Sequence, residues 1–295
     1  MIDLWHVGFI NRPMSDALTP GALRASEITW LPDPGPFRFV ADPFGVRTQD
    51  GMTVFVEAYD YRVKRGEIHY YSYGHDATLK ASGQALLRPF HLSYPYLIRD
   101  GGELYMLPEA HRSGALTLYR CTRFPDQWAP AERLLELPAI DATVARYDGR
   151  WWMFYALPGP DGRAMRELHI AWADRLQGPW HQHAANPVRQ GYESSRPGGN
   201  PFVHDGALYL PMQDCVGTYG AALNLLRIDT LAPDSFVAES VVRLSPKGLR
   251  DGYADGLHTL AGADDVTFID VKRIERSWRE PFIRLEHKLR RAFRR

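Results

Sequence analysis

The stretch DATVARYDGRWWMFYA (residues 141–156) holds an Asp-Gly pair, Asp148–Gly149, between two runs rich in apolar and aromatic residues. An Asp-Gly pair in this position is typical of a tight β-hairpin turn, because such turns need positive φ angles that Gly and Asp tolerate. The stretch therefore predicts two antiparallel strands joined by a short turn.

The same pattern recurs four more times along the chain. Its turns fall at Asp50–Gly51, Gly101–Gly102, Asp205–Gly206 and, in a looser version, Gly262. First strands are expected to begin at Asp42, Tyr94, Asp141, Asn200 and Asp255, roughly 50 residues apart. Further β-prone runs after most hairpins make each unit four-stranded. Radial repetition of such units is typical of a propeller, so we predict one five-bladed β-propeller over residues 1–274, closed by residues 3–10 as the outer strand of blade five.

Composition excludes several classes of protein. The 295 residues have a formal net charge of zero, which argues against nucleic-acid binding. Two cysteines provide no disulfide framework, as is typical of a reducing compartment. Neither a secretory signal nor a long apolar run is visible, so the sequence predicts a cytoplasmic protein.

Acidic and polar residues recur at the open end of each predicted hairpin, and these ends should meet at one mouth of the propeller. Crowded carboxyl groups have pKa values pushed apart, which suits chemistry at a glycosidic bond: one acid protonates a leaving oxygen and one carboxylate activates a nucleophile. The catalytic candidates are Asp42, Glu109 and Asp141. The substrate-binding candidates are Glu57, Tyr94, Arg196, Asn200, Asp214, Asp255, His258, Asp270, Lys272 and Arg273.

Each candidate also has a simpler interpretation. Asp or Asn before Pro often starts a turn, so these residues could only cap strands. Arg196, Lys272 and Arg273 could neutralise the acids or hold the phosphate of a donor substrate. The aromatic candidates could stack on sugars or pack between blades; they are Tyr94, Trp151, Trp152 and Tyr155.

Neither a metal nor a cofactor is predicted. The chain has no Gly-rich phosphate loop, and its histidines His69, His169 and His258 lack the spacing of a metal-ligand motif.

The last stretch, residues 275–295, differs from the rest. Over residues 280–295 a 3- and 4-residue spacing of apolar residues predicts an amphipathic helix with a basic face. Such a helix is typical of a membrane-surface element, here on the inner membrane face, or of one that docks on a partner. A terminal helix packed on the propeller explains the pattern equally well.

Several runs together resemble one known propeller domain. They are FVADPF (39–44), HLSYPYLIRDGGELYMLPEA (91–110), DATVARYDGRWWMFYA (141–156) and RPGGNPFVHDGALYLPMQDC (196–215). The domain stands at the N-terminus of plant glucosamine inositolphosphorylceramide transferases and is also attached to bacterial formyltransferase-like proteins. The resemblance covers about residues 35–273 and implies a role in glycan or glycolipid assembly.

Ala41-Asp42-Pro43 also resembles, more distantly, the propellers of glycoside hydrolase families 43 and 32, in which acids on successive blades form the site. By that resemblance Asp42 matches the carboxylate of blade one. The chain departs from family 43 at Tyr94, where that family would carry Asp, and in the blade that provides Glu109.

Three hypotheses about function follow. The first is glycosyl transfer from a sugar or sugar-nucleotide substrate, with Asp42 or Asp141 as base or stabiliser and Glu109 as acid or acceptor-orienting group. The second is a family-43-like glycosidase with Asp42 as base and Glu109 as acid. The third is a non-catalytic sugar-binding or scaffold propeller.

Overall fold

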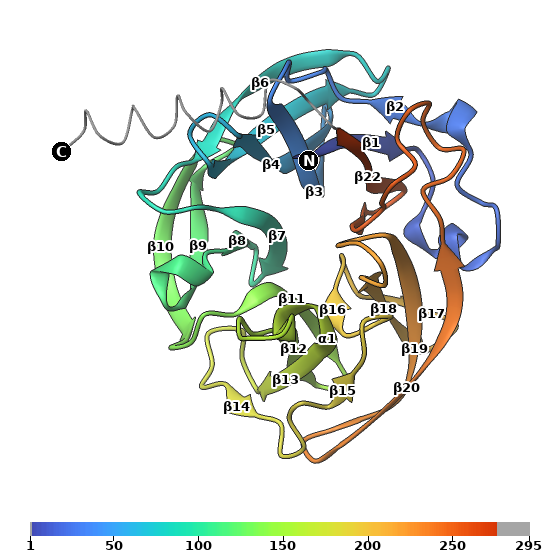
Figure 1. Ribbon diagram of the computed structural model, residues 1–295. Coiled ribbons are helices and arrows are strands. Elements are labelled where there is room, and N and C mark those ends of the chain that lie inside the picture. Colours follow the sequence, from blue (N-terminus) through green and yellow to red (C-terminus); the bar gives the residue numbers. More distant parts are fainter. Residues whose placement is uncertain (1, 276–295) are drawn as a thin grey trace.

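The computed structural model describes residues 2–275 and contains five antiparallel sheets arranged around a central axis (Figure 1). This arrangement confirms the predicted five-bladed β-propeller. The Asp-Gly turns occur where the repeat placed them, since Asp148 and Asp205 take φ angles of 47° and 48° and the glycines after them are also positive.

Each of the first four blades is formed by strands that are consecutive in the sequence. Blade one contains β3 (Arg38–Thr48), β4 (Gly51–Asp60), β5 (Arg65–Gly74) and β6 (Leu79–Leu86). Blade two contains β7 (Ser93–Asp100), β8 (Glu103–Glu109), β9 (Leu116–Arg123) and β10 (Gln127–Leu135). Blade three contains β11 (Ile140–Tyr147), β12 (Arg150–Ala156), β13 (Glu167–Ala173) and β14 (His181–Gln182), with β15 (Arg189–Gln190) also on β13. Blade four contains β16 (Arg196–Pro197) and β17 (Phe202–His204), both paired with β18 (Ala207–Asp214), then β19 (Ala222–Ala232) and β20 (Ser235–Leu244).

Helices are few and short in the described part of the chain. They are the 3-10 turns η1 (Met14–Leu18), η2 (Ala25–Glu27) and η3 (His111–Ser113) and the single-turn helix α1 (Arg163–Arg166). None of the helices within residues 2–275 has the length and apolar character needed to cross a membrane.

Blade five joins the two ends of the chain and closes the ring. Its order is β21 (Leu260–Ala263), β22 (Val266–Glu275), β1 (Ile2–Ile10) and β2 (Thr29–Trp30), and Figure 1 shows β1 beside β22. The predicted closure is therefore confirmed. The prediction that the N-terminal run is outermost is wrong in detail: β1 is the third strand, and the two-residue β2 pairs with it at Gly8 and Phe9. Main-chain pairing between the two ends of the chain thus holds the ring closed.

Large apolar side chains pack between neighbouring blades. One continuous cluster joins blades five, one, two and three, and includes Phe9, Phe44, Tyr94 and Tyr155. Trp152 belongs to a second cluster, shared by blades three and four. Because Tyr94, Trp151, Trp152 and Tyr155 are all at most 8% exposed, they serve packing rather than sugar stacking.

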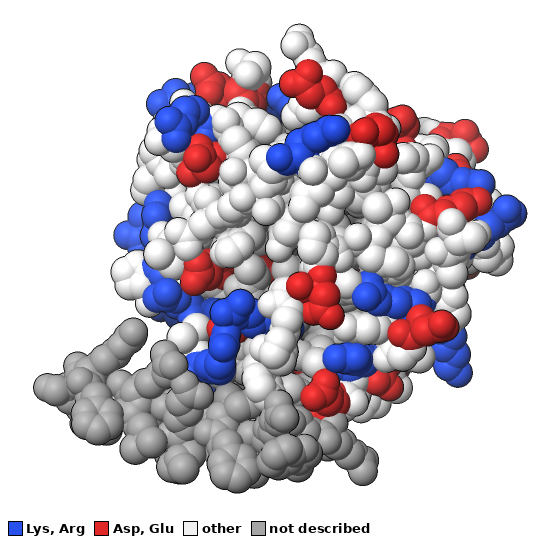
Figure 2. All heavy atoms as spheres, turned by 90° about the horizontal axis from the view of Figure 1, so that it is seen from above, with Lys and Arg blue, Asp and Glu red and all other residues white. Residues whose placement is uncertain are grey.

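The outer surface carries mixed charge. In the view of Figure 2, basic and acidic side chains are intermingled around a largely uncharged area. The predicted helix over residues 280–295 lies outside the described residues, and of the predicted 275–295 segment only Glu275 is described, as the last residue of β22.

Candidate functional site

The first strands of blades one, two and three each contain one strained residue, which lies second in β7 and β11 but fifth in β3, because β3 begins at Arg38 and not at the predicted Asp42. Asp42, Tyr94 and Asp141 take φ angles of 52°, 45° and 49°, and each coincides with a shift in the pairing of the first two strands of its blade. Such bulges turn side chains out of the regular alternation, and a positive φ is unusual for a residue as bulky as Tyr94. The three blades therefore have equivalent β-bulges at one end of the propeller.

Asp42 and Asp270 tie neighbouring blades together. The Asp42 carboxylate accepts hydrogen bonds from the Tyr94 amide at 3.1 Å and the Thr259 hydroxyl at 3.2 Å. Asp270 accepts hydrogen bonds from the Asp42 amide at 3.0 Å and the His258 amide at 3.1 Å. These carboxylates thus hold backbone amides of neighbouring segments in place, a structural role like the one that the simpler interpretation suggested.

His258 lies between these two carboxylates. Its Nδ1 is 2.7 Å from Asp270 Oδ2 and its Nε2 is 3.4 Å from Asp42 Oδ1, while its ring stacks on Trp5 at 3.7 Å. Burial raises the pKa of Asp42 to about 7, against the opposing charge of His258. The ligand atoms of Asp42, His258 and Asp270 lie within 4.8 Å of one another, so they are the groups that could hold a cation in place of the His258 proton.

Glu57 and Glu109, at the ends of β4 and β8, form an acid pair with opposite electrostatic environments. Burial, reinforced by the charges of Asp42 and Glu109, raises the pKa of Glu57 well above its ordinary value. Burial would also raise the pKa of Glu109, but the hydrogen bond with His111 Nδ1 at 2.5 Å and the charge of Arg196 outweigh burial and lower it. The two pKa values are thus shifted in opposite directions, upward for Glu57 and downward for Glu109, as acid–base chemistry needs.

A glycine allows the Glu57 side chain to approach its neighbours. A Cβ atom on Gly66 would lie 2.5 Å from Glu57 Oε1 and 2.8 Å from His91 Cε1. The Gly66 amide donates a hydrogen bond to His91 Nδ1 at 2.8 Å, which leaves the proton of neutral His91 on Nε2, 3.5 Å from Glu57 Oε1. His91 therefore faces Glu57 as a hydrogen-bond donor.

Asp141 is neutralised by Arg196. The Arg196 Nε lies 2.7 Å from Asp141 Oδ2, and Gln213 Nε2 donates to the same oxygen at 2.8 Å. Arg196 also lies over the Tyr219 ring, 4.8 Å from its centroid. Of the predicted cations, Arg196 is the one that reaches the mouth acids.

Two predicted acids do not join this group. Asp214 is paired with Arg243, whose Nε is 3.0 Å from Asp214 Oδ2, because Asp214 points to the opposite face of β18 from Gln213. Asp255 is exposed, and its carboxylate accepts a hydrogen bond from the Ile274 amide. The prediction that the first strand of blade five begins at Asp255 is wrong: β21 begins at Leu260.

Three further candidates have structural partners. Lys272 is fully buried, and its Nζ contacts Thr218 Oγ1 at 3.1 Å and the Tyr219 carbonyl. Arg273 pairs with Glu275 at 3.3 Å. Asn200 Oδ1 accepts a hydrogen bond from the Gly262 amide and so links blades four and five.

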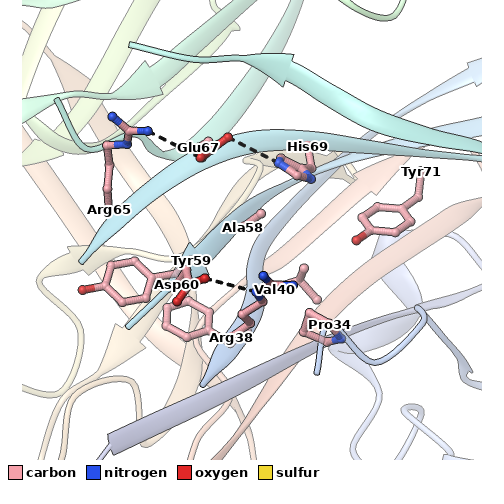
Figure 3. A pocket seen from close by; sticks show the side chains of 11 residues that line it. Pro34, Arg38, Val40, Ala58, Tyr59, Asp60, Arg65, Glu67, His69 and Tyr71 are labelled. Atoms are coloured by element: carbon pink, nitrogen blue, oxygen red, sulfur yellow. Dashed lines mark hydrogen bonds and ion pairs between the residues drawn. The ribbon is translucent and has the colours of Figure 1, made fainter. Parts of the chain in front are cut away.

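A groove of about 390 Å³ runs along blade one from the stacked rings of Phe39 and Tyr59. Figure 3 shows Arg65, Glu67 and His69 in a row along β5. Glu67 lies close to both neighbours, 3.7 Å from Arg65 and 3.6 Å from His69. Arg38 and Asp60 form a further pair at 3.1 Å. An aromatic rim with paired polar groups suits a sugar more than a free anion.

Sequence reasoning missed several residues of the mouth. His91 and His111 flank the acid pair, and Tyr219 covers Arg196. For His111, its position two residues after Glu109 could have indicated a contact with that acid. Tyr219 lies in the loop after β18, and nothing local marks it.

Glu57→Gln is expected to stabilise the protein at pH 8 but not at pH 4.5. Folded Glu57 keeps a proton that the unfolded chain releases above its ordinary pKa of 4.5, so wild-type stability falls as pH rises. Gln removes this dependence, and a raise of even one pKa unit corresponds to about 1.4 kcal/mol. Urea unfolding at both pH values measures the free energy of unfolding of the variant and the wild type. Glu103→Gln, at an exposed position of β8, is the control. Equal stability of Glu57→Gln and wild type at pH 8 would show that Glu57 is not held protonated.

Solved structures share the fold. The catalytic domain of the Coprinopsis cinerea GH62 α-L-arabinofuranosidase matches with a TM-score of 0.58 and 10% identity, covering 82% of this chain and 93% of that one. Zg3597, a family 117 glycoside hydrolase of Zobellia galactanivorans, matches with a TM-score of 0.54 and 14% identity, covering 80% and 85%. At these identities the likeness concerns the fold alone.

Sequence relatives are closer. A curated protein of Oryza sativa subsp. indica, glucosamine inositolphosphorylceramide transferase 1, is 37% identical over 207 residues, which are 68% of this chain and 28% of the relative. The Arabidopsis thaliana protein of the same name is 32% identical over 252 residues, 81% of this chain and 33% of the relative. The chain thus spans no more than a third of these relatives' length. Residues 30–256 match the family model described as "Glucosamine inositolphosphorylceramide transferase 1, N-terminal", and the chain therefore belongs to that family.

Proposed function

We propose that this propeller is a carbohydrate-active enzyme that transfers a sugar in the assembly of a glycolipid or another cell-surface glycan, with the chemistry at its mouth. The names of the curated relatives support sugar transfer as the reaction. Because the chain matches no more than a third of those relatives' length, their names do not say which part of them reacts. The argument for the propeller itself rests on its acids.

The observation that carries the proposal is the opposite shift of the pKa values of Glu57 and Glu109. In the proposed step, Glu109 takes the proton of an acceptor hydroxyl while the acceptor oxygen bonds to the anomeric carbon of the donor sugar. The bond from that carbon to the leaving oxygen breaks, and Glu57 gives its proton to the leaving oxygen. Proton exchange with water then restores both groups.

This proposal changes the roles expected from sequence. Glu109 was the expected acid, but its lowered pKa favours a base or a stabiliser of positive charge, and Glu57 takes the acid role. Asp42 and Asp141 are held by the Tyr94 amide and by Arg196, so they shape the mouth and its field.

Assays with two substrate classes test the proposal. The wild type and a Glu57→Gln/Glu109→Gln double variant are incubated with sugar nucleotides plus candidate lipid or sugar acceptors, and separately with chromogenic glycosides. Transfer that depends on the pair supports the proposal. Glycoside hydrolysis without transfer would replace it with a glycosidase, with water as the acceptor. Glycan binding with neither activity would replace it with a sugar-binding module.

A cytoplasmic location on the inner membrane face remains part of the proposal through residues 280–295, whose sequence carries the basic amphipathic pattern. We expect the full chain to float with anionic vesicles and a chain ending at residue 279 to float less, because the basic face is attracted to anionic lipid. Flotation in a density gradient at low and high salt measures this. Equal flotation of the two chains would remove the membrane role.

A further inference from the structure

A second pocket opens beside the acid pair, between blades one and two. Its volume is about 270 Å³, and its walls are the turn after β4, the segment before β7 and one residue of η3. The lining residues include Lys64, Arg65 and Arg112 and no acidic side chain. We call it the Lys64–Arg112 pocket.

Two of the three cations of this pocket have no acidic partner among the described residues. Within residues 2–275, Lys64 and Arg112 are exposed and form no ion pair. Arg65 reaches Glu67 at 3.7 Å, but its Nε is buried without a hydrogen-bond partner in the described part of the chain. Three cations around a small volume, one with an unused buried donor, suit an anion of more than one charge.

The neighbouring groove of Figure 3 shares Arg65 but lacks this excess of charge. Its other basic side chains have acidic neighbours, since Arg38 pairs with Asp60 and His69 lies beside Glu67. An anion is therefore attracted to the Lys64–Arg112 pocket and not to the groove.

The pocket is joined directly to the acid pair through His91. This residue lines the pocket, accepts the Gly66 amide hydrogen bond at Nδ1, and places Nε2 3.5 Å from Glu57 Oε1. Burial, reinforced by the charge of Arg112, lowers the pKa of His91, and the same charge opposes the rise that the Glu109 hydrogen bond gives to the pKa of His111. A group bound in the pocket thus lies one side chain, His91, away from Glu57.

We propose that the Lys64–Arg112 pocket binds a phosphate ester group of the substrate while the sugar lies between Glu57 and Glu109. This inference rests on the proposed function and deepens it by giving the charged part of the substrate its own subsite. It moves phosphate binding away from Lys272 and Arg273, whose charged groups have partners within the protein. Two sources carry this chemistry, the diphosphate of a sugar nucleotide and the phosphodiester of a lipid headgroup.

Direct binding of inorganic pyrophosphate to the full-length protein tests the inference without any turnover. We expect calorimetry at low ionic strength to show binding that Lys64→Ala/Arg112→Ala weakens by about tenfold or more, the loss typical of hydrogen bonds to charged groups. The control, Arg146→Ala/Lys247→Ala, removes the same charge from exposed positions away from the pocket and should leave binding unchanged. No binding by the wild type, or equal losses in the two double variants, would overturn the proposal.

Paired ligands identify the source of the phosphate. The affinity of a nucleoside diphosphate is compared with that of its nucleoside, and the affinity of inositol phosphate with that of inositol. In one of these pairs the phosphate should increase the affinity, and Lys64→Ala/Arg112→Ala should remove that increase. That pair identifies the source. Binding of glucuronate with no binding of any phosphate would overturn the proposal in favour of a carboxylate site.

The Glu57→Gln/Glu109→Gln variant separates this inference from the proposed function. It should bind pyrophosphate as the wild type does, whether or not the wild type transfers sugar. Failure of the enzyme assays with intact, pocket-dependent phosphate binding would disprove the catalytic proposal alone. Sugar transfer that survives in full in Lys64→Ala/Arg112→Ala would disprove the phosphate subsite alone.

Discussion

Replacing Glu57 by glutamine is expected to lower the rate of sugar transfer by about 10²–10⁴-fold, the usual contribution of a positioned general acid. The substitution keeps the size and most of the polarity of the side chain but removes the proton that the leaving oxygen would receive. Burial and neighbouring negative charge raise the pKa of Glu57 and so favour keeping that proton.

Glu109→Gln is expected to reduce the rate by a similar factor, with a different pH profile. Wild-type activity should be bell-shaped, limited by ionisation of Glu57 on the alkaline side and by protonation of Glu109 on the acid side. Glu57→Gln should remove the alkaline limb from the residual activity, and Glu109→Gln the acid limb. Rates of the two variants from pH 4 to 9 measure this, with Glu103→Gln as the control from the far end of β8. Identical profiles for both variants would contradict the assignment of roles.

Arg196→Met is expected to destabilise the propeller by about 3–5 kcal/mol, the cost of breaking a buried ion pair from one side. Arg196 is the cation closest to Asp141, at 2.7 Å, and its charge also lowers the pKa of Glu109. Without Arg196, Asp141 and Glu109 remain buried with less compensation. Urea unfolding at pH 7 measures the loss.

The control is Arg243→Met, since Arg243 pairs with Asp214 at 3.0 Å but is 55% exposed. An exposed pair contributes up to about 1 kcal/mol, so this variant should lose much less. A second substitution, Asp141→Asn, should restore part of the stability of Arg196→Met, because no uncompensated charge then remains. Equal stability of Arg196→Met and Arg243→Met would show that the ion pair of Arg196 and Asp141 is more hydrated than its burial indicates.

The fold was predictable because its main determinants are local. The turn at Asp148–Gly149 and its four relatives depend on residues within a few positions of each other, and their spacing set the number of blades. Blade five was harder: β21 begins at Leu260 rather than at Asp255, and β1 lies third in its sheet. These details depend on pairing between the two ends of the chain, which no local pattern encodes.

The sequence predicted which acidic residues lie at the mouth, but not how they interact there. Position in the repeat brought Asp42, Glu57, Glu109 and Asp141 to one end of the propeller, and the pKa of Glu57 responds to the other three. Whether a side chain faces the mouth or turns away depended on alternation along one strand, as for Gln213 and Asp214.

By itself, then, the sequence determined the five-bladed ring and the end at which acids gather, since both follow from short-range turns repeated at a regular interval. Only the tertiary structure decided which carboxyl group keeps a proton and which cations remain unpaired. Those properties depend on burial and on charges from other blades, such as Arg196 beside Asp141, 55 residues apart in the chain and 2.7 Å apart in space.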